Sequence, residues 1–154
     1  MCCTIKPPAR RYYKVINTIT MHTLPIQIRF NDIDQMGHVN NAVIMEYFDL
    51  AKSDYFTAVG LPPEEGDFTV MIVHFEVDFK AQIHFHDKVA VSTRVERFGT
   101  KSLTVEQQVV SPEGDKVYAV CHTVMAGYCR SAASAAPIPE EVKERIRNFD
   151  MQNA

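Results

Sequence analysis

One long helical pattern, followed by a series of strand patterns, constrains the fold of this sequence more than any other feature. Asn40 is a residue type that caps helix N-termini, and Gly60 is a type that ends helices. Between them, apolar side chains recur at helical spacing: Ile44, Tyr47, Phe48, Ala51, Tyr55, Ala58 and Val59. The apolar stripe is broad, so other elements must cover this helix.

The cover is predicted downstream, where apolar and polar residues alternate as they do in half-buried strands. Four such patterns, separated by short turn sequences, run over residues 71–83, 89–95, 103–109 and 117–128. We expect them to form an antiparallel meander, with the last strand in a central position because both of its faces are apolar. A further strand precedes the helix, with Leu24, Ile26, Ile28 and Phe30 on one face. The predicted fold class is α+β.

The length of 154 residues suits one domain, which we divide into three parts. Residues 1–22 are predicted to be a flexible or mis-annotated N-terminal arm, with Met21 as a possible true start. Residues 23–130 form the folded domain. Residues 131–154 comprise a linker of small residues and a short helix with an apolar stripe of Val142, Ile146 and Phe149.

Composition and charge exclude several classes of partner. The net charge is −3, so the basic patch that nucleic-acid binding needs is not expected. No apolar run is long enough to span a membrane. The four cysteines are Cys2, Cys3, Cys121 and Cys129, and they show no disulfide or metal-binding spacing. We therefore expect reduced thiols in a cytoplasmic protein with no nucleic-acid or membrane partner.

The segment just before the helix carries the residues best suited to chemistry. It contains two carboxylates, Asp32 and Asp34, together with Gly37 and His38. Free backbone N–H groups at a helix start favour negative charge, which is what an acyl-transfer site needs where an oxyanion develops. A carboxylate beside them can act as the nucleophile or as the general base that activates water. The sequence leaves these two roles open.

The pattern D-x-D-x-x-G-H-V-N-N, followed by Glu46-Tyr47-Phe48, resembles the 4-hydroxybenzoyl-CoA thioesterase-like family of hotdog proteins. It is also similar to the acyl-ACP thioesterases. The resemblance runs from about residue 26 to residue 56 and continues more weakly through residues 98–102. It implies the hotdog fold, in which a curved antiparallel sheet wraps around one long central helix. It further implies hydrolysis of acyl-CoA, or of acyl-ACP, to a free acid and a thiol. No cofactor is implied beyond the coenzyme A of the substrate.

The resemblance also assigns site residues. Asp34 matches the family's catalytic carboxylate, His38 matches a residue that orients substrate or water, and the backbone N–H near Asn41 matches the group that polarises the thioester carbonyl. Two groups of substrate-binding residues are expected, the first beside this site and the second meeting the phosphates of coenzyme A across a subunit boundary. They are Gly37, Val39, Asn40 and Tyr47, and then Arg97, Lys101 and Ser102. The open sheet edges predict a homodimer or homotetramer.

Each assignment has a simpler alternative. Asp34 could merely bind loop amides, as Asp residues in turns often do, and Asp32 is expected to be structural and to pair with Arg29. The Arg97–Ser102 region could be no more than a solvated hairpin tip. His84 and His86 would share one strand face, but the sequence offers no evident third ligand, so no metal is predicted.

The resemblance has departures, and two rival functions stay open. The family often has an aromatic residue where this chain has Ile44 and an arginine where it has Lys52, and the acyl-ACP branch has an asparagine where it has Met36. The rivals are a hotdog hydratase and a non-catalytic module that binds acyl-CoA. The length and the aromatic or aliphatic nature of the acyl group are not determined by the sequence.

Overall fold

The computed structural model describes residues 21–61 and 65–152. The predicted N-terminal arm, except for its last two residues, and Cys2 and Cys3 lie outside the described residues. The elements in chain order are β1 (His22–Ile26), the 3-10 helix η1 (Phe30–Asp32), α1 (Asn41–Ala58), β2 (Phe68–Phe79), β3 (Val89–Phe98), β4 (Ser102–Val110), β5 (Val117–Cys129), β6 (Ser134–Ala135) and α2 (Glu140–Gln152).

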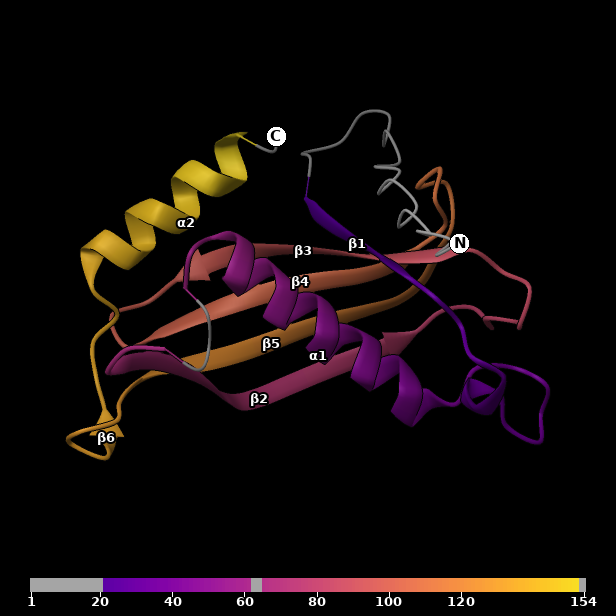
Figure 1. Cartoon of the computed structure of the whole chain (residues 1–154), viewed down its shortest axis with the longest axis horizontal. Helices are drawn as coiled ribbons and strands as arrows, with labels where there is room; N and C mark the ends of the chain where they lie inside the picture. Colours follow the sequence, from indigo (N-terminus) through magenta and orange to yellow (C-terminus); the bar gives the residue numbers. More distant parts are fainter. Residues whose placement is uncertain (1–20, 62–64, 153–154) are drawn as a thin grey trace, which may run out of the picture.

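The strands form one antiparallel sheet in the order β1-β3-β4-β5-β2, and the short β6 pairs with β5 beyond the first residue of β4. The long helix α1 lies across one face of this sheet (Figure 1). The sheet therefore supplies the cover that the broad apolar stripe of α1 requires. The prediction of an α+β fold with one long helix against a curved antiparallel sheet is confirmed.

The predicted four-strand meander is wrong in one respect. β2 pairs with β5 and not with β3, so only β3, β4 and β5 form a meander. Residues 80–88 carry the chain from one edge of the sheet to the other side, and β2 ends at Phe79 instead of reaching Ile83. His84 and His86 therefore lie in a loop and not on a strand face. Alternation identifies a strand but does not identify its neighbour, which explains the error.

The first strand is also shorter than predicted. β1 ends at Ile26, and Leu24, Ile26 and Ile28 pack against the core as expected. Phe30 instead begins the 3-10 helix and is 81% exposed. The chain thus leaves the sheet before the alternating pattern ends, and after Ile28 it turns toward the start of α1.

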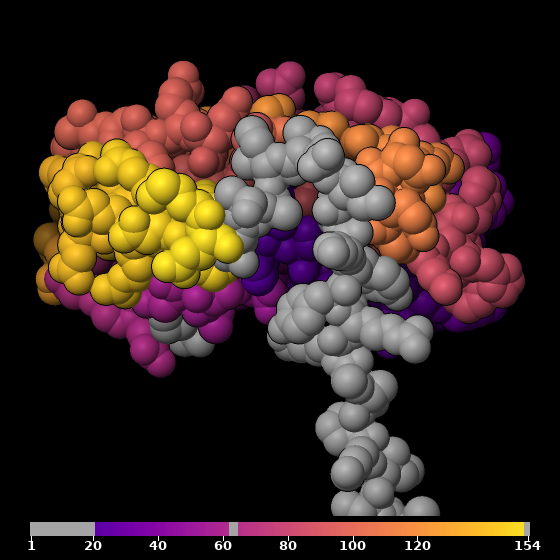
Figure 2. Space-filling view, turned by 90° about the horizontal axis from the view of Figure 1, so that it is seen from above, coloured from indigo at the N-terminus to yellow at the C-terminus, as the bar shows by residue number. Residues whose placement is uncertain are grey.

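The core lies between α1 and the sheet in two clusters, one near each end of the helix. The first includes Val39, Phe48 and Val91, and the second includes Tyr55 and Leu103. The C-terminal helix α2 belongs to the second cluster, since Ile146 is fully buried there. Figure 2 shows α2 lying against the β3–β4 side of the molecule, with α1 beneath it. The segment after residue 130 is thus part of the folded unit.

Strand β2 forms an edge of the sheet and is unusually apolar for that position. Within the described residues it has a strand partner only on its β5 side. Five large apolar side chains along it are exposed by 42–62%: Met71, Ile72, Val73, Phe75 and, at its end, Phe79. Such an edge offers both unpaired backbone groups and apolar surface to a partner.

Candidate active site

Asp32 holds the loop between β1 and α1 in place. Its carboxylate is 1% exposed and accepts hydrogen bonds from the Arg29 backbone N–H (2.8 Å), the Arg29 guanidinium (2.9 Å) and the Tyr47 hydroxyl (2.6 Å). Burial alone would raise the pKa of Asp32, but these hydrogen bonds outweigh burial and lower the pKa below its ordinary value. The Asp32 carbonyl also accepts from the Asn40 N–H, so one buried residue fixes both ends of the segment.

Residues 33–39 form a tight hairpin that presents Asp34. A β-bridge between Ile33 and Val39 closes the hairpin, and the Gly37 N–H donates to the Asp34 carbonyl at 3.0 Å. Gly37 adopts a φ of 81°, a left-handed conformation that glycine takes at little cost. The left-handed backbone conformation at position 37 therefore explains why the pattern has a glycine there.

The Asp34 carboxylate lies beside His38 at the surface of this hairpin. One carboxylate oxygen accepts from the Met36 N–H at 2.8 Å, and the other lies 4.0 Å from His38 Nδ1. The side chains of Asp34 and His38 are 25% and 19% exposed, so both are accessible from solvent yet held by the loop. A carboxylate in this setting can accept a proton from water or attack an electrophile.

The start of α1 follows the hairpin directly. The Asn40 side chain caps the helix by accepting a hydrogen bond from the Ala42 N–H at 2.8 Å, and the Asn40 N–H donates to the Asp32 carbonyl. Within the described residues the Asn41 N–H has no acceptor, and Asn41 is exposed. That N–H and the Asp34 hairpin lie at the same end of the molecule, so a free donor at a helix N-terminus accompanies the carboxylate.

Two residues predicted to bind substrate are buried beneath this site. Val39 is 1% exposed and packs in the core, while its N–H donates to the Ile83 carbonyl at 2.8 Å. Tyr47 is 4% exposed, and its hydroxyl is engaged by Asp32. In the single chain these side chains support the loop from below and do not face solvent.

The predicted phosphate-binding residues lie at the other end of the sheet. β3 starts at Val89, opposite Ile26, and runs to Phe98, a length of about 30 Å at roughly 3.3 Å per residue. Lys101 and Ser102 follow in the hairpin to β4, so a single chain does not bring them to Asp34. Arg97 lines a pocket of about 540 Å³ that is also lined by Glu76 and Glu96. The negative charges of these two side chains would repel a phosphate in that pocket.

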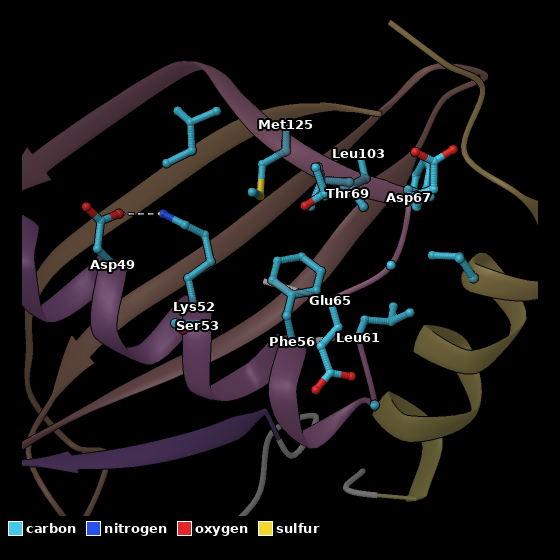
Figure 3. A pocket seen from close by; sticks show the side chains of 16 residues that line it. Asp49, Lys52, Ser53, Phe56, Leu61, Glu65, Asp67, Thr69, Leu103 and Met125 are labelled. Carbon is cyan, nitrogen blue, oxygen red and sulfur yellow. Dashed lines mark hydrogen bonds and ion pairs between the residues drawn. The ribbon is translucent and has the colours of Figure 1, made fainter. Parts of the chain in front are cut away.

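A second cavity was not predicted from the sequence. It measures about 670 Å³ and lies between the second half of α1, β2 and the start of α2 (Figure 3). This volume is typical of small-molecule sites. We call it the chamber; its lining is largely apolar, with Phe56, Leu61, Phe68, Val70, Ile72, Leu103, Met125 and Val142. The lysine at position 52, noted in the sequence only as a departure from the family, is the one basic residue among its described lining residues.

A row of buried polar side chains on the strands beneath α1 was also not predicted from the sequence. Gln107 is fully buried in β4 and donates from Nε2 to the Phe48 carbonyl of the helix at 2.8 Å and to Thr93 at 3.1 Å. Cys121 lies on the neighbouring strand 3.4 Å from the Thr123 hydroxyl, and burial raises the pKa of its thiol. The available signal was Gln107 itself, a polar residue on the otherwise apolar face of its strand.

Two further properties bear on the kinds of site the chain can hold. Across residues 21–61 and 65–152, no group of three or more histidine, cysteine, aspartate or glutamate side chains is placed to hold a metal ion. No helix in the same part of the chain has the length and apolar character needed to cross a membrane.

Comparisons with known proteins identify the relatives of this chain. A thioesterase of Thermus thermophilus, crystallised with coenzyme A and zinc, is 34% identical, with 83% of this chain and 93% of that chain covered at a TM-score of 0.71. The PA5185 protein of Pseudomonas aeruginosa is 27% identical over 84% of this chain and 92% of its own, with a TM-score of 0.74. The YsmA protein of Bacillus subtilis is 22% identical over 79% of this chain and 82% of its own. A family model matches residues 28–146, and the chain belongs to the thioesterase-like superfamily.

Proposed function

We propose that this protein hydrolyses acyl-CoA thioesters to a free acid and coenzyme A, with Asp34 as the catalytic carboxylate. One observation carries the proposal: the accessible Asp34 carboxylate and the unpaired N–H of Asn41 lie at the same end of the molecule. The family supports thioester hydrolysis as the class of reaction. The coenzyme A in the crystals of the Thermus thermophilus thioesterase supports CoA, over acyl carrier protein, as the carrier.

The proposed reaction needs a base or nucleophile, an oxyanion donor and water. Asp34 either takes a proton from the attacking water or attacks the carbonyl carbon itself, in which case water then cleaves the resulting anhydride. The Asn41 N–H donates to the carbonyl oxygen as negative charge develops there. The C–S bond then breaks, and the thiolate leaves and is protonated. His38, 4.0 Å from Asp34, orients the water or the substrate. The reaction requires no cofactor beyond the coenzyme A of the substrate.

The decisive experiment measures thiol release from a panel of acyl-CoAs by wild type and by Asp34→Asn. We expect a fall in kcat of about 100-fold or more, as for loss of a general base. Asp87→Asn is the matched control, because Asp87 is also a loop carboxylate that accepts a backbone N–H at 2.8 Å. Full activity of Asp34→Asn would remove Asp34 from the mechanism, and a wild type that binds but cleaves no acyl-CoA would favour a binding module.

We further propose that the functional unit is at least a homodimer joined through the β2 edges. Antiparallel pairing of two β2 strands about a two-fold axis would cover the exposed apolar side chains of this edge. It would also place the end of one copy that carries Arg97, Lys101 and Ser102 beside the Asp34 end of the other. The CoA phosphates would then be met across the subunit boundary.

Light scattering coupled to size-exclusion chromatography tests the dimer. Wild type should elute at no less than twice the mass of the chain. Val73→Lys, which places a charge on the β2 edge at a side chain that is 62% exposed, should yield monomers. Met151→Lys, at a similarly exposed methionine of α2, should not. Monomeric wild type would contradict the proposal.

The state of the described cysteines supports a cytoplasmic location. Cys121 and Cys129 are both free, as expected in a reducing compartment. We therefore propose that the protein acts in the cytoplasm.

A further inference from the structure

The chamber contains a buried cation. The Lys52 side chain is 8% exposed and projects from α1 among apolar groups of the chamber, where Phe56 lies one turn further along the helix (Figure 3). Its ammonium donates to Asp49 at 2.9 Å, and Asp49 is the only partner that it has within the described residues. The Asp49 side chain is 69% exposed, so it lies at the rim while the ammonium lies inside.

This arrangement makes the chamber unsuited to a purely apolar ligand. An ammonium carries three N–H donors, and Asp49 accepts one of them. An alkyl group that displaced water from the other two would leave them buried without acceptors, which is unfavourable. A ligand oxygen at the same place would restore the missing hydrogen bond. Lys52 therefore favours an acceptor on the ligand.

The charges around the chamber indicate that this acceptor is neutral. Asp49 already balances the charge of Lys52. Two more carboxylates, Glu65 and Asp67, line the chamber, and Asp67 is held by Ser131. A ligand carboxylate would face three acidic side chains and one basic one, so it would be repelled. A hydroxyl or keto oxygen meets no such penalty.

The position of Lys52 also fixes how far the oxygen lies from the thioester. Asn41, Met45, Asp49, Lys52 and Phe56 follow one another at spacings of three or four residues, so they share one face of α1. The ammonium of Lys52 lies beside Asp49, at 2.9 Å from its carboxylate. Asn41 and Asp49 are eight residues apart, so the ammonium lies about 12 Å along the helix from the Asn41 N–H. An extended alkyl chain advances about 1.25 Å per carbon, given bond lengths of about 1.5 Å. A chain of about ten carbons spans the distance.

We propose that Lys52 is a specificity-determining residue that selects medium-chain acyl groups carrying a hydroxyl or keto oxygen near their distal end. The proposal rests on the proposed thioesterase function and names its substrate class. Because the chamber lies beyond the first turns of α1, Lys52 is expected to act on substrate choice and not on the chemical step.

The test compares kcat/KM for three CoA thioesters of equal length: decanoyl-CoA, ω-hydroxydecanoyl-CoA and the ω-carboxy analogue. Wild type should prefer the hydroxylated substrate over the other two by about tenfold, the selectivity expected of one hydrogen bond to a charged group. Lys52→Met should lose this preference and Lys52→Arg should keep it. Lys143→Met, which removes another lysine ion-paired to an acid three residues away, should behave as wild type.

Two outcomes would overturn the proposal: equal kcat/KM for decanoyl-CoA and its hydroxylated analogue in wild type, or a preference that survives in Lys52→Met. Calorimetry with non-hydrolysable thioether analogues of the same compounds separates this question from catalysis. If wild type cleaves none of the thioesters, the proposed hydrolysis fails. A calorimetric preference for the hydroxylated analogue that disappears in Lys52→Met would still establish the role of Lys52, and equal binding would refute it.

Discussion

Tyr47→Phe isolates the hydrogen bond that anchors the loop of the candidate active site. The substitution removes only the hydroxyl, which donates at 2.6 Å to the buried carboxylate of Asp32. A hydrogen bond to a charged group contributes about 1.5–3 kcal/mol to stability. Two hydrogen bonds from Arg29 and the ion pair with its guanidinium remain on the carboxylate, so Asp32 stays paired after the change. We therefore expect Tyr47→Phe to lower the free energy of unfolding by about 1.5–2 kcal/mol, the lower end of this range.

The cost should depend on pH in a defined direction. Hydrogen bonds from Tyr47 and Arg29 lower the pKa of Asp32 despite its burial. A carboxylate with a lowered folded-state pKa contributes stability above its unfolded pKa of about 3.9, and this contribution is lost as the pH falls through the folded-state pKa. The difference between wild type and Tyr47→Phe should be complete at neutral pH and should shrink in acid below about pH 4.

Urea unfolding followed by circular dichroism, at several pH values, measures both effects. Tyr118→Phe is the matched control: Tyr118 is 5% exposed, and its hydroxyl has no hydrogen bond within the described residues. Tyr47→Phe should therefore lower the free energy of unfolding more than Tyr118→Phe does. Equal losses in the two variants, or a Tyr47→Phe loss that persists unchanged in acid, would refute the reasoning.

Three further predictions concern the hairpin and the C-terminal helix. Gly37→Ala should lower the unfolding free energy by about 1 kcal/mol because its φ is 81°, and it should reduce thiol release by disturbing the Asp34 hairpin; unchanged stability and activity would contradict this. Ile146→Ala should destabilise by about 2–5 kcal/mol in urea unfolding, since Ile146 is fully buried, whereas a loss below about 1 kcal/mol would mean that α2 is not part of the core. Burial raises the pKa of Asp150, although the Tyr55 hydroxyl and the Val95 N–H partly offset it. Because a raised carboxyl pKa makes stability fall as the pH rises through the folded-state value, the stability of Asp150→Asn relative to wild type should increase as the pH rises above about 4. Urea midpoints measure this, and a difference that stays constant with pH would argue against it.

Much of the fold was predictable because the helix and the strands carry clear periodicities. The helix prediction was accurate: Asn40 is the cap and the helix ends just before Gly60. The pairing of β2 was not predictable, since nothing in its alternation distinguishes β3 from β5 as a neighbour. The exposure of Phe30 depends on where the chain leaves the sheet, which the alternating pattern does not mark.

The candidate site divides in the same way. The candidate site residues Asp34, Gly37, His38 and Asn41 are close together in the sequence. A sequence motif could therefore group them, although their roles stay predictions. The chamber depends on residues from α1, β2, β4, β5 and α2, and no local pattern assembles those. Lys52 looks like an ordinary polar residue of a helix until its burial is known.

The contact between Arg145 and Gly60 has a consequence for how this protein can evolve. Arg145 in α2 donates to the Gly60 carbonyl at 2.9 Å, and the neighbouring turn of α2 contributes Val142 to the chamber. The far wall of the chamber is thus built by the last part of the described chain, while Asp34 lies in the first third. Mutations in α2 can alter the shape of the chamber without touching the hairpin that carries Asp34. Under the proposed function, diversification of this helix among descendants would yield enzymes that share one reaction and differ in the acyl groups they accept.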